Sequence, residues 1–322
     1  MTTQIDECHV VQLTAPSGLL IDASIANNRV LEEFYRDYDA AFILANEKEG
    51  YAGFAECLEL NSGEAYEKLT QRYGIFREFV IVVYDPETKA RIGGANFIAF
   101  PLKTLNEIDR PFLSINLNYI FINPDQRKRG YFKQVIKDLP ELAFRLLLAT
   151  NQLDMPKIWR ADDFHEPVEL PQTLVFLEQN DPFVMSAEDY KLDTAHSGLD
   201  QLDRIAIWTG LGAKIVDFPY VQPPLTDTQS AAHDLVLAVI GMEADTLDPH
   251  LLHQHLERFF GISVLKGTDV ARNASAAKQL ALLTHASEQG KPLRLLSGES
   301  LAKSADANTG VRPASLRDAL RS

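Results

Sequence analysis

The sequence predicts an α/β or mixed α+β fold, with one twisted mixed β-sheet flanked by helices. Two observations support this prediction. Runs of β-branched and aromatic residues, which favour strands, alternate with segments whose apolar residues recur at helical spacing. Strand-like runs also come in pairs separated by short breaks, within residues 78–101 and again within 213–241, which is typical of hairpins.

The N-terminal part is expected to contain a strand and two helices. Residues 8–15, CHVVQLTA, are a candidate first strand. From Asn28 to about Glu47, apolar residues recur every three or four positions, which predicts an amphipathic helix. A second helix is expected between Ser62, a suitable N-cap, and Gly74, a suitable stop.

Three strands and a long helix are expected next. The runs 78–85 and 91–101 predict an antiparallel hairpin, because PETKA breaks the strand pattern between them. Residues 112–123 predict a further strand, with Ser114, Asn116 and Asn118 on one face. A helix is expected over about 130–150, which Pro140 could kink or divide.

The remaining elements of the predicted sheet follow in order. Residues 173–181 predict a short buried strand and residues 199–212 a helix that stops at its glycines. The runs 213–221 and 233–241 are predicted to pair as two strands.

The C-terminal third is expected to lie outside the sheet domain. Helices are predicted over 248–261, with Asp248 as cap and Pro249 at the first position, and over 275–290. The predicted organisation is therefore a domain over 1–241, a helical extension over 242–296 and a small, polar, flexible tail over 297–322.

Composition and charge exclude several classes of protein. The net charge of −14 and the pI of about 5.0 argue against general nucleic-acid binding, which needs a basic surface. No apolar run reaches the ~20 residues that a membrane span requires, so no membrane partner is expected. Cys8 and Cys57 provide no disulfide framework or cysteine-rich metal site. With no secretory pattern at residues 1–11, a cytoplasmic location is expected.

One basic segment stands out in this acidic chain. Residues 126–137 contain five cations and no acid, and Gly130 lies where a strand is expected to turn into a helix. The first N–H groups of such a helix are unpaired and favour an anion, while a glycine leaves room for a phosphate. These features fit a pyrophosphate ligand. The alternative is an ordinary solvated helix start, since charge runs often have no other role.

The segment YIFINPDQRKRGYF, residues 119–132, resembles motif A of the GNAT superfamily of acyl-CoA-dependent N-acetyltransferases. Arg127 and Gly130 match its first two fixed positions, and Phe132 stands where glycine or alanine is usual. Three further segments resemble the family's neighbouring elements, namely the hairpin over 78–97, VFLEQND over 175–181, and WTGLGAKIVDF over 208–218. The resemblance covers roughly residues 30–240, so the predicted first domain is GNAT-like.

The resemblance implies acetyl-CoA or another acyl-CoA as co-substrate. No metal is expected, because the chain has two cysteines and its histidines lack ligand spacing. The turn would bind the coenzyme A pyrophosphate, and pantetheine amides would pair with strand backbone near Tyr119, Phe121 and Ile122. Asn180 fits a position that often contacts the cofactor. The expected cofactor-binding residues are Tyr119, Phe121, Ile122, Arg127, Lys128, Arg129, Gly130, Tyr131, Phe132 and Asn180.

In this family the amine attacks the thioester directly, so a base rather than a nucleophile is required. Glu178 is the candidate catalytic base, with a solvated strand residue as the alternative, and Asp181 is the next nearest carboxylate. Trp208 stands where a tyrosine often protonates the leaving thiolate, a task that indole cannot perform at neutral pH. His165 is either a base near the acceptor or, more simply, a surface histidine.

Two further groups of residues bear on the acceptor and on a metal site. Residues 182–201 form a long connection whose acids Glu188, Asp189 and Asp193 would favour a cationic amine acceptor. The trio His250, His253 and His255 lacks the spacing and the paired carboxylate of a metal site.

Three functions remain open at this point. The first is an N-acyltransferase, with a small-molecule or peptide amine as acceptor. The second is a non-catalytic acyl-CoA-binding or interaction protein on the same fold, and the third is a site for a different phosphate ligand. Nucleic acid and membrane are not expected as partners, and a homodimer is an open option.

Overall fold

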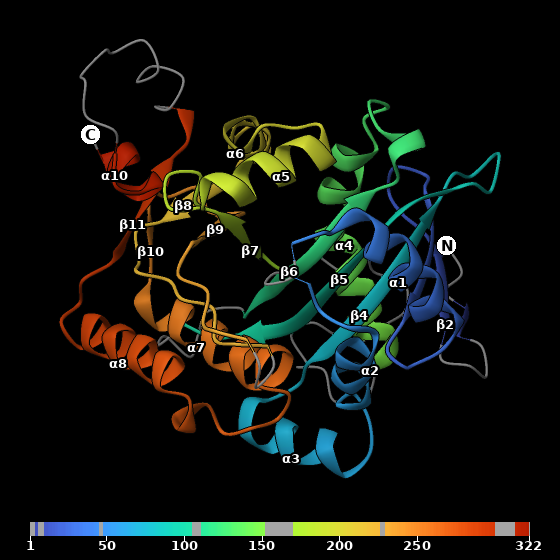
Figure 1. Ribbon diagram of the computed structural model, residues 1–322. Coiled ribbons are helices and arrows are strands. Elements are labelled where there is room, and N and C mark those ends of the chain that lie inside the picture. The colour runs from blue at the N-terminus through green and yellow to red at the C-terminus, as the bar shows by residue number, and fades with distance from the viewer. Residues whose placement is uncertain are drawn as a thin grey trace. The chain divides into compact units, whose positions relative to one another are not determined.

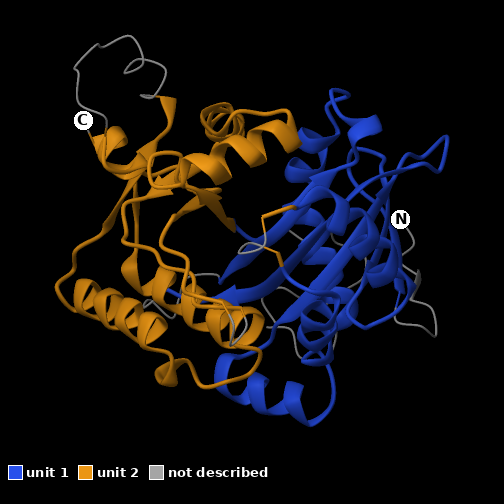
Figure 2. Cartoon of the chain, viewed as in Figure 1, with its two compact units in different colours: residues 1–42, 49–173 blue, residues 43–48, 174–322 orange. Residues whose placement is uncertain are grey.

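A computed structural model describes most of the chain. The described residues are 4–5, 10–44, 48–104, 111–151, 170–225, 229–299 and 313–321. The chain folds into two compact units (Figure 2), unit 1 with residues 1–42 and 49–173 and unit 2 with residues 43–48 and 174–322. Each unit combines a β-sheet with flanking helices (Figure 1), which confirms the predicted mixed α/β class. The three-part division at residues 241 and 296 stays a prediction.

Unit 1 has an antiparallel sheet. In spatial order its described strands are β1 (Gln4–Ile5), β2 (Val10–Thr14), β3 (Leu20–Ser24), β4 (Arg77–Tyr84), β5 (Arg91–Leu102) and β6 (Phe112–Ile122). Its described helices are α1 (Arg29–Ala41), α2 (Tyr51–Glu59), α3 (Gly63–Tyr73), the short 3₁₀ turn η1 (Pro124–Gln126) and α4 (Tyr131–Thr150). Helix α1 packs on β3, β4 and β5, whereas α4 packs on β5 and β6 from the other face (Figure 1).

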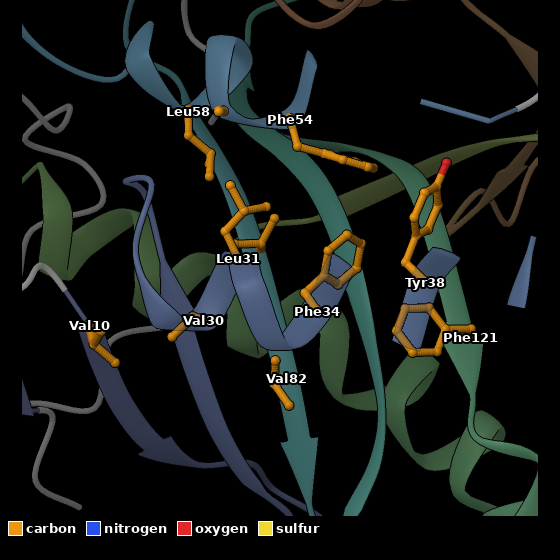
Figure 3. Close-up of a cluster of buried hydrophobic side chains, with 11 residues drawn as sticks. Val10, Val30, Leu31, Phe34, Tyr38, Phe54, Leu58, Val82 and Phe121 are labelled. Atoms are coloured by element: carbon orange, nitrogen blue, oxygen red, sulfur yellow. The ribbon is translucent and has the colours of Figure 1, made fainter. Parts of the chain in front are cut away.

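The core under α1 is aromatic. Phe34 and Tyr38 of α1 are fully buried and lie against Phe54 of α2 and Phe121 of β6 (Figure 3). Large aromatic side chains bury much apolar area, so this cluster fixes α1 and α2 on the sheet. It also places the end of β6, and therefore the turn that follows it.

The described strands of unit 2 also pair in antiparallel fashion. In spatial order they are β7 (Thr173–Asn180), β9 (Leu235–Ile240), β8 (Lys214–Val216), β11 (Leu293–Ser297) and β10 (Thr246–Leu247). The helical elements are α5 (Ala187–Ser197), α6 (Gln201–Thr209), α7 (Pro249–Phe259), the π-helical turn η3 (Phe260–Val264), the 3₁₀ turn η4 (Val270–Arg272), α8 (Ala274–Glu288) and α10 (Leu316–Arg321). Helices α7 and α8 pack together on one side of the strands, and α5 and α6 lie on the other side (Figure 1).

Most predicted elements are confirmed, with three differences of note. The strand expected over 213–221 ends at Val216, because the N–H groups of Phe218 and Tyr220 bond only two residues back and turn the chain. Helix α4 runs through Pro140 without division. Residues 182–201 contain helix α5, capped by Ser186, where the sequence indicated a long loop.

Part of the C-terminal segment is anchored in unit 2. Residues 313–321 lie within the stretch expected to be flexible, and they include helix α10. Leu316 is fully buried, and its N–H donates to both carboxylate oxygens of Asp181 at 2.9 and 2.8 Å. Residues 300–312 lie outside the described part of the chain. No helix within the described ranges is long and apolar enough to span a membrane.

Candidate functional site

The basic segment forms a tight turn between β6 and α4. Strand β6 ends at Ile122, η1 follows, and Gly130 is the N-cap of α4 in the left-handed conformation, with φ 83° and ψ 0°. Lys128 also has a positive φ of 64°. The N-cap is a glycine, which has no side chain to accept from the first N–H groups of α4, so the helix start keeps the amide donors that an anion site uses.

Space and charge at this turn both suit a phosphate. A Cβ added to Gly130 would meet no atom within 4 Å. Lys128, Arg129 and Lys133 are exposed, and the first turn of α4 contains no acid. Because the helix dipole and these cations act in the same sense, the turn attracts a polyanion. The residues present therefore fit the pyrophosphate of coenzyme A.

A network of polar contacts holds the turn in place. Asn123, directly after β6, donates to Asp37 of α1 at 3.1 Å and to the Arg91 carbonyl at 3.2 Å. Arg91 in turn binds Asp37 through two hydrogen bonds of 2.8 and 3.1 Å. The end of β6 is thus tied to both α1 and β5, which pre-organises the turn.

Two residues predicted to bind the cofactor have roles within the protein. Arg127 donates from Nε to the Ile122 carbonyl at 3.1 Å, which closes the turn on itself. Tyr131 donates its hydroxyl to Asp85 of the β4–β5 turn at 2.8 Å, and Thr88 and Tyr131 hold the pKa of Asp85 down to about 2. These contacts position the first turn of α4, while cofactor contacts by Arg127 and Tyr131 stay predictions.

The predicted residues of β6 lie at the end of the strand. Phe121 is buried against Phe34, Ile122 is buried, and Tyr119 is half-buried among aromatic rings of α1 and α2. Gly93 of β5 allows the close approach, since a Cβ there would lie 2.1 Å from the Phe121 carbonyl oxygen. The side chains thus serve the core, and the backbone pairing with pantetheine stays a prediction.

Unit 1 also contains a buried polar cluster that the sequence did not indicate. Glu78 of β4 is 1% exposed, and its Oε1 accepts from Asn96 at 2.8 Å and from Asn118 at 2.9 Å. Asn116 donates to Asn118, which is the extra residue of a β-bulge in β6 opposite β5. Two sequence signals could have found this cluster, an acid inside an apolar strand and the polar face that Asn116 and Asn118 share on the next strand.

The candidate base lies in unit 2. Glu178 of β7 is partly buried, and its carboxylate accepts a hydrogen bond from the hydroxyl of Tyr220. Burial raises the pKa of Glu178 to about 7, although the bond from Tyr220 lowers it. A carboxyl with a pKa near neutrality is suited to accept and release a proton at physiological pH.

The other candidates of β7 divide into two groups. Asn180 is buried and lies on the same face of β7 as Glu178, two residues along the strand. Asp181 instead binds the backbone N–H groups of Leu316 and Phe183. Its carboxylate anchors helix α10, and burial raises its pKa although the backbone N–H groups of Leu316 and Phe183 lower it.

Several of the remaining candidate residues are buried or bind other groups of the protein. Trp208 is buried on α6, and His255 is fully buried with its ring stacked on Phe176 at 3.9 Å. Asp193 of α5 pairs with Arg204 of α6 at 2.6 Å, and Asp189 binds Ser186, the N-cap of its own helix. Two of the three acids expected to attract an acceptor thus bind groups within the α5–α6 segment. No group of three potential metal ligands occurs in the described residues. His165 lies outside them.

Comparison with known proteins adds structural likenesses. No protein-family model and no curated protein matches the chain. A solved structure from Bacteroides thetaiotaomicron, described as a GNAT-family acetyltransferase, is 14% identical, with a TM-score of 0.37, over 74% of this chain and 94% of its own.

Two further structures extend this likeness. The ribosomal-protein-S18-alanine N-acetyltransferase of Escherichia coli is 14% identical, with a TM-score of 0.31, over 70% of this chain and 98% of its own. Arabidopsis thaliana NAA60, solved in complex with acetyl-CoA, is 11% identical, with a TM-score of 0.29, over 69% and 99%. All three TM-scores are below 0.5, so the chemistry is argued from the residues of this chain.

Proposed function

We propose that the protein is an N-acyltransferase that moves an acetyl or other acyl group from acyl-CoA to a small-molecule or peptide amine. The observation that supports this most directly is the start of α4, where Gly130 is a left-handed N-cap and three exposed cations, Lys128, Arg129 and Lys133, lie within three residues of it along the chain. An anionic ligand gains both from the helix dipole and from charge-assisted hydrogen bonds at such a site.

The residues proposed for cofactor binding and for proton transfer have distinct tasks. The amides after Gly130, with Lys128 and Arg129, hold the coenzyme A pyrophosphate, and Asn180 contributes a polar contact to the cofactor. The thioester supplies the acyl group: the amine forms the new C–N bond as the C–S bond breaks. Glu178 accepts the proton that the amine gives up, directly or through water, and Asp37, Arg91 and Asn123 keep the turn fixed meanwhile.

The pKa of Glu178 fits this task. At about 7 it leaves a substantial fraction of the carboxylate ionised at neutral pH, and the protonated form can still return its proton to water. An ordinary carboxylate, with a pKa near 4, would be a much weaker base toward an amine.

The alternative is a non-catalytic acyl-CoA-binding protein on the same fold. Trp208, buried on α6, favours it because indole cannot protonate the leaving thiolate. Both proposals require coenzyme A binding and differ in turnover.

Calorimetry with coenzyme A and acetyl-CoA tests the shared requirement. We expect micromolar binding by the native protein and at least a ~10-fold loss in Gly130→Glu, because the new carboxylate lies at the anion site and a side chain is strained at this φ. Gly198→Glu is the matched control, since Gly198 also has a positive φ (68°), open space around it, and a place at a helix end.

Two further measurements separate the alternatives. Pantetheine, which lacks the pyrophosphate, should bind equally to native protein and Gly130→Glu. An acceptor screen that gives no acyl transfer despite cofactor binding would favour the non-catalytic protein. If the native protein does not bind coenzyme A, the turn is a basic helix start or a site for a different anion, and the proposed function fails.

A further inference from the structure

Helix α8, in the C-terminal part of the chain, is connected by hydrogen bonds to the candidate base. We propose that Gln279 of α8 and Tyr220 act as positioning residues that hold the Glu178 carboxylate in a fixed, hydrogen-bonded state. The proposal rests on the proposed function in one respect, that Glu178 is the base. Under this proposal, α8 helps to orient the carboxylate of the proposed base.

The first link joins α8 to the segment after β8. The carboxamide of Gln279 accepts from the Val221 N–H at 3.0 Å and donates to the Val221 carbonyl at 2.7 Å. Gln279 is 3% exposed, so water does not compete for these bonds. A side-chain amide that binds both groups of one residue fixes its backbone in the way that a neighbouring strand would.

The second link fixes Tyr220, which directly precedes this clamp. On the far side of Val221, Gln222 exchanges two backbone hydrogen bonds with Ala232, at 3.1 and 2.9 Å. The Tyr220 ring is 4% exposed and lies 6.1 Å from the ring of Phe260. Its backbone and its ring are both held, so the hydroxyl has a defined direction.

The third link is the hydrogen bond from the Tyr220 hydroxyl to Glu178. Within the described residues, Tyr220 is the one hydrogen-bond partner of this carboxylate. Burial and the adjacent negative charge raise the pKa of Tyr220 well above its ordinary value, so the phenol keeps its proton at neutral pH and donates it to the hydrogen bond.

The surroundings of Glu178 contain few other charges. On β9 its register partner is Leu237, which is apolar. On α7, His255 stacks on Phe176, two residues before Glu178, and burial lowers the pKa of His255 so that it stays neutral. Arg258 of α7 acts electrostatically on His255 and binds the Gln254 carbonyl. Tyr220 is therefore the group whose loss should change the ionisation of Glu178 most.

The test is an NMR titration of Glu178 in protein labelled with ¹³C at glutamate carboxyls, with Glu178→Gln used to assign the signal. In Tyr220→Phe, which keeps the ring, we expect the pKa of Glu178 to rise by about one to two units, because the charged form loses its donor. Gln279→Met, which keeps the volume but not the amide, should raise this pKa by a smaller amount. Tyr190→Phe is the control, since it removes another tyrosine-to-carboxylate bond in unit 2, to Asp200.

The outcomes separate this inference from the proposed function. The titration needs no acyl-CoA, so it is informative even if the protein has no transferase activity. Where turnover is measurable, the acid limb of kcat/KM in Tyr220→Phe should move to higher pH by the same shift, with about tenfold lower kcat/KM at pH 7. A Tyr220→Phe variant with lower thermal stability but an unchanged pKa of Glu178 would show a purely structural role and overturn the proposal.

Discussion

Glu78 in unit 1 and Glu178 in unit 2 are both shielded from water, but their carboxylates accept different numbers of hydrogen bonds. Glu78 of β4 is 1% exposed, and two asparagine amides, from Asn96 and Asn118, donate to its carboxylate. Glu178 of β7 accepts one hydrogen bond, from Tyr220. The loss of water is thus better compensated at Glu78 than at Glu178.

The difference separates a structural from a functional use of the same side chain. A carboxylate surrounded by amide donors is stabilised in its charged form and ties three strands together. A carboxylate with a single donor has a raised pKa, about 7 for Glu178, and is ready to exchange a proton. Under this comparison, mutations at Glu78 should affect stability, and mutations at Glu178 should affect proton transfer.

The largest effect is expected for Glu78→Leu. Each amide keeps a second acceptor, the Phe79 carbonyl for Asn96 and the Asn96 carboxamide oxygen for Asn118. The substitution therefore leaves one N–H of each amide without its acceptor, at a cost of about 1–3 kcal/mol for each. We expect the free energy of unfolding to fall by about 2–5 kcal/mol in urea denaturation. Glu78→Gln is the control, because its carbonyl oxygen can still accept from both amides, and it should cost less. Equal losses in the two variants would mean that volume rather than hydrogen bonding determines the effect.

An intermediate effect of opposite sign is expected for Glu178→Gln. The pKa of Glu178 in the folded protein, about 7, lies above its ordinary value near 4.5, so the folded state binds more protons between these values. The contribution of Glu178 to stability is therefore present below about pH 4.5 and is lost as the pH rises toward 7. Glutamine keeps an acceptor for Tyr220 but carries no charge. We expect Glu178→Gln to match the native protein at pH 5 and to be more stable by about 1–3 kcal/mol at pH 8.

Urea denaturation at the two pH values measures this difference. Glu64→Gln is a suitable control, because Glu64 is an exposed acid paired with Lys68 on α3 and should give no gain at pH 8. A stability difference for Glu178→Gln that does not change with pH would contradict the raised pKa and remove the contrast with Glu78.

Local sequence signals predicted the helices and strands well, but they did not predict the different surroundings of Glu78 and Glu178. Helix α3 lies between Ser62 and Gly74, and α7 starts after Asp248 at Pro249, as the sequence indicated, because caps and stops act within a few residues. The partners of Glu78 lie 18 and 40 residues away, and they meet only because β4, β5 and β6 pair in one register with a bulge at Asn118. Such contacts depend on tertiary structure and leave no local pattern.

The same reasoning explains how much of the candidate site was accessible from the sequence. The turn at Gly130 was predicted because a strand, a glycine and a helix follow one another directly along the chain. Glu178 could be named from its strand, but Tyr220 and Gln279 could not be linked to it, since they lie 42 and 101 residues further along. The segment before Tyr220 was predicted as a strand, whereas it turns after Val216 for contacts that the sequence does not display.

The smallest effect is expected at Lys128, which extends the comparison to the turn itself. Lys128 has a φ of 64°, a conformation that costs a side chain with a Cβ about 1 kcal/mol and glycine much less. Lys128→Gly should therefore raise the free energy of unfolding by about 0.5–1 kcal/mol, reduced somewhat by the greater freedom of glycine in the unfolded chain. If Lys128 contributes charge to the anion site, the same variant should bind coenzyme A more weakly.

Lys89→Gly is the matched control for Lys128→Gly, because Lys89 has a φ of 60° in the β4–β5 turn. It should gain similar stability without a change in coenzyme A binding. Equal coenzyme A affinity in both variants would show that the turn binds through its backbone and not through the Lys128 ammonium group, whereas a loss confined to Lys128→Gly would show that a strained residue is kept there for its charge.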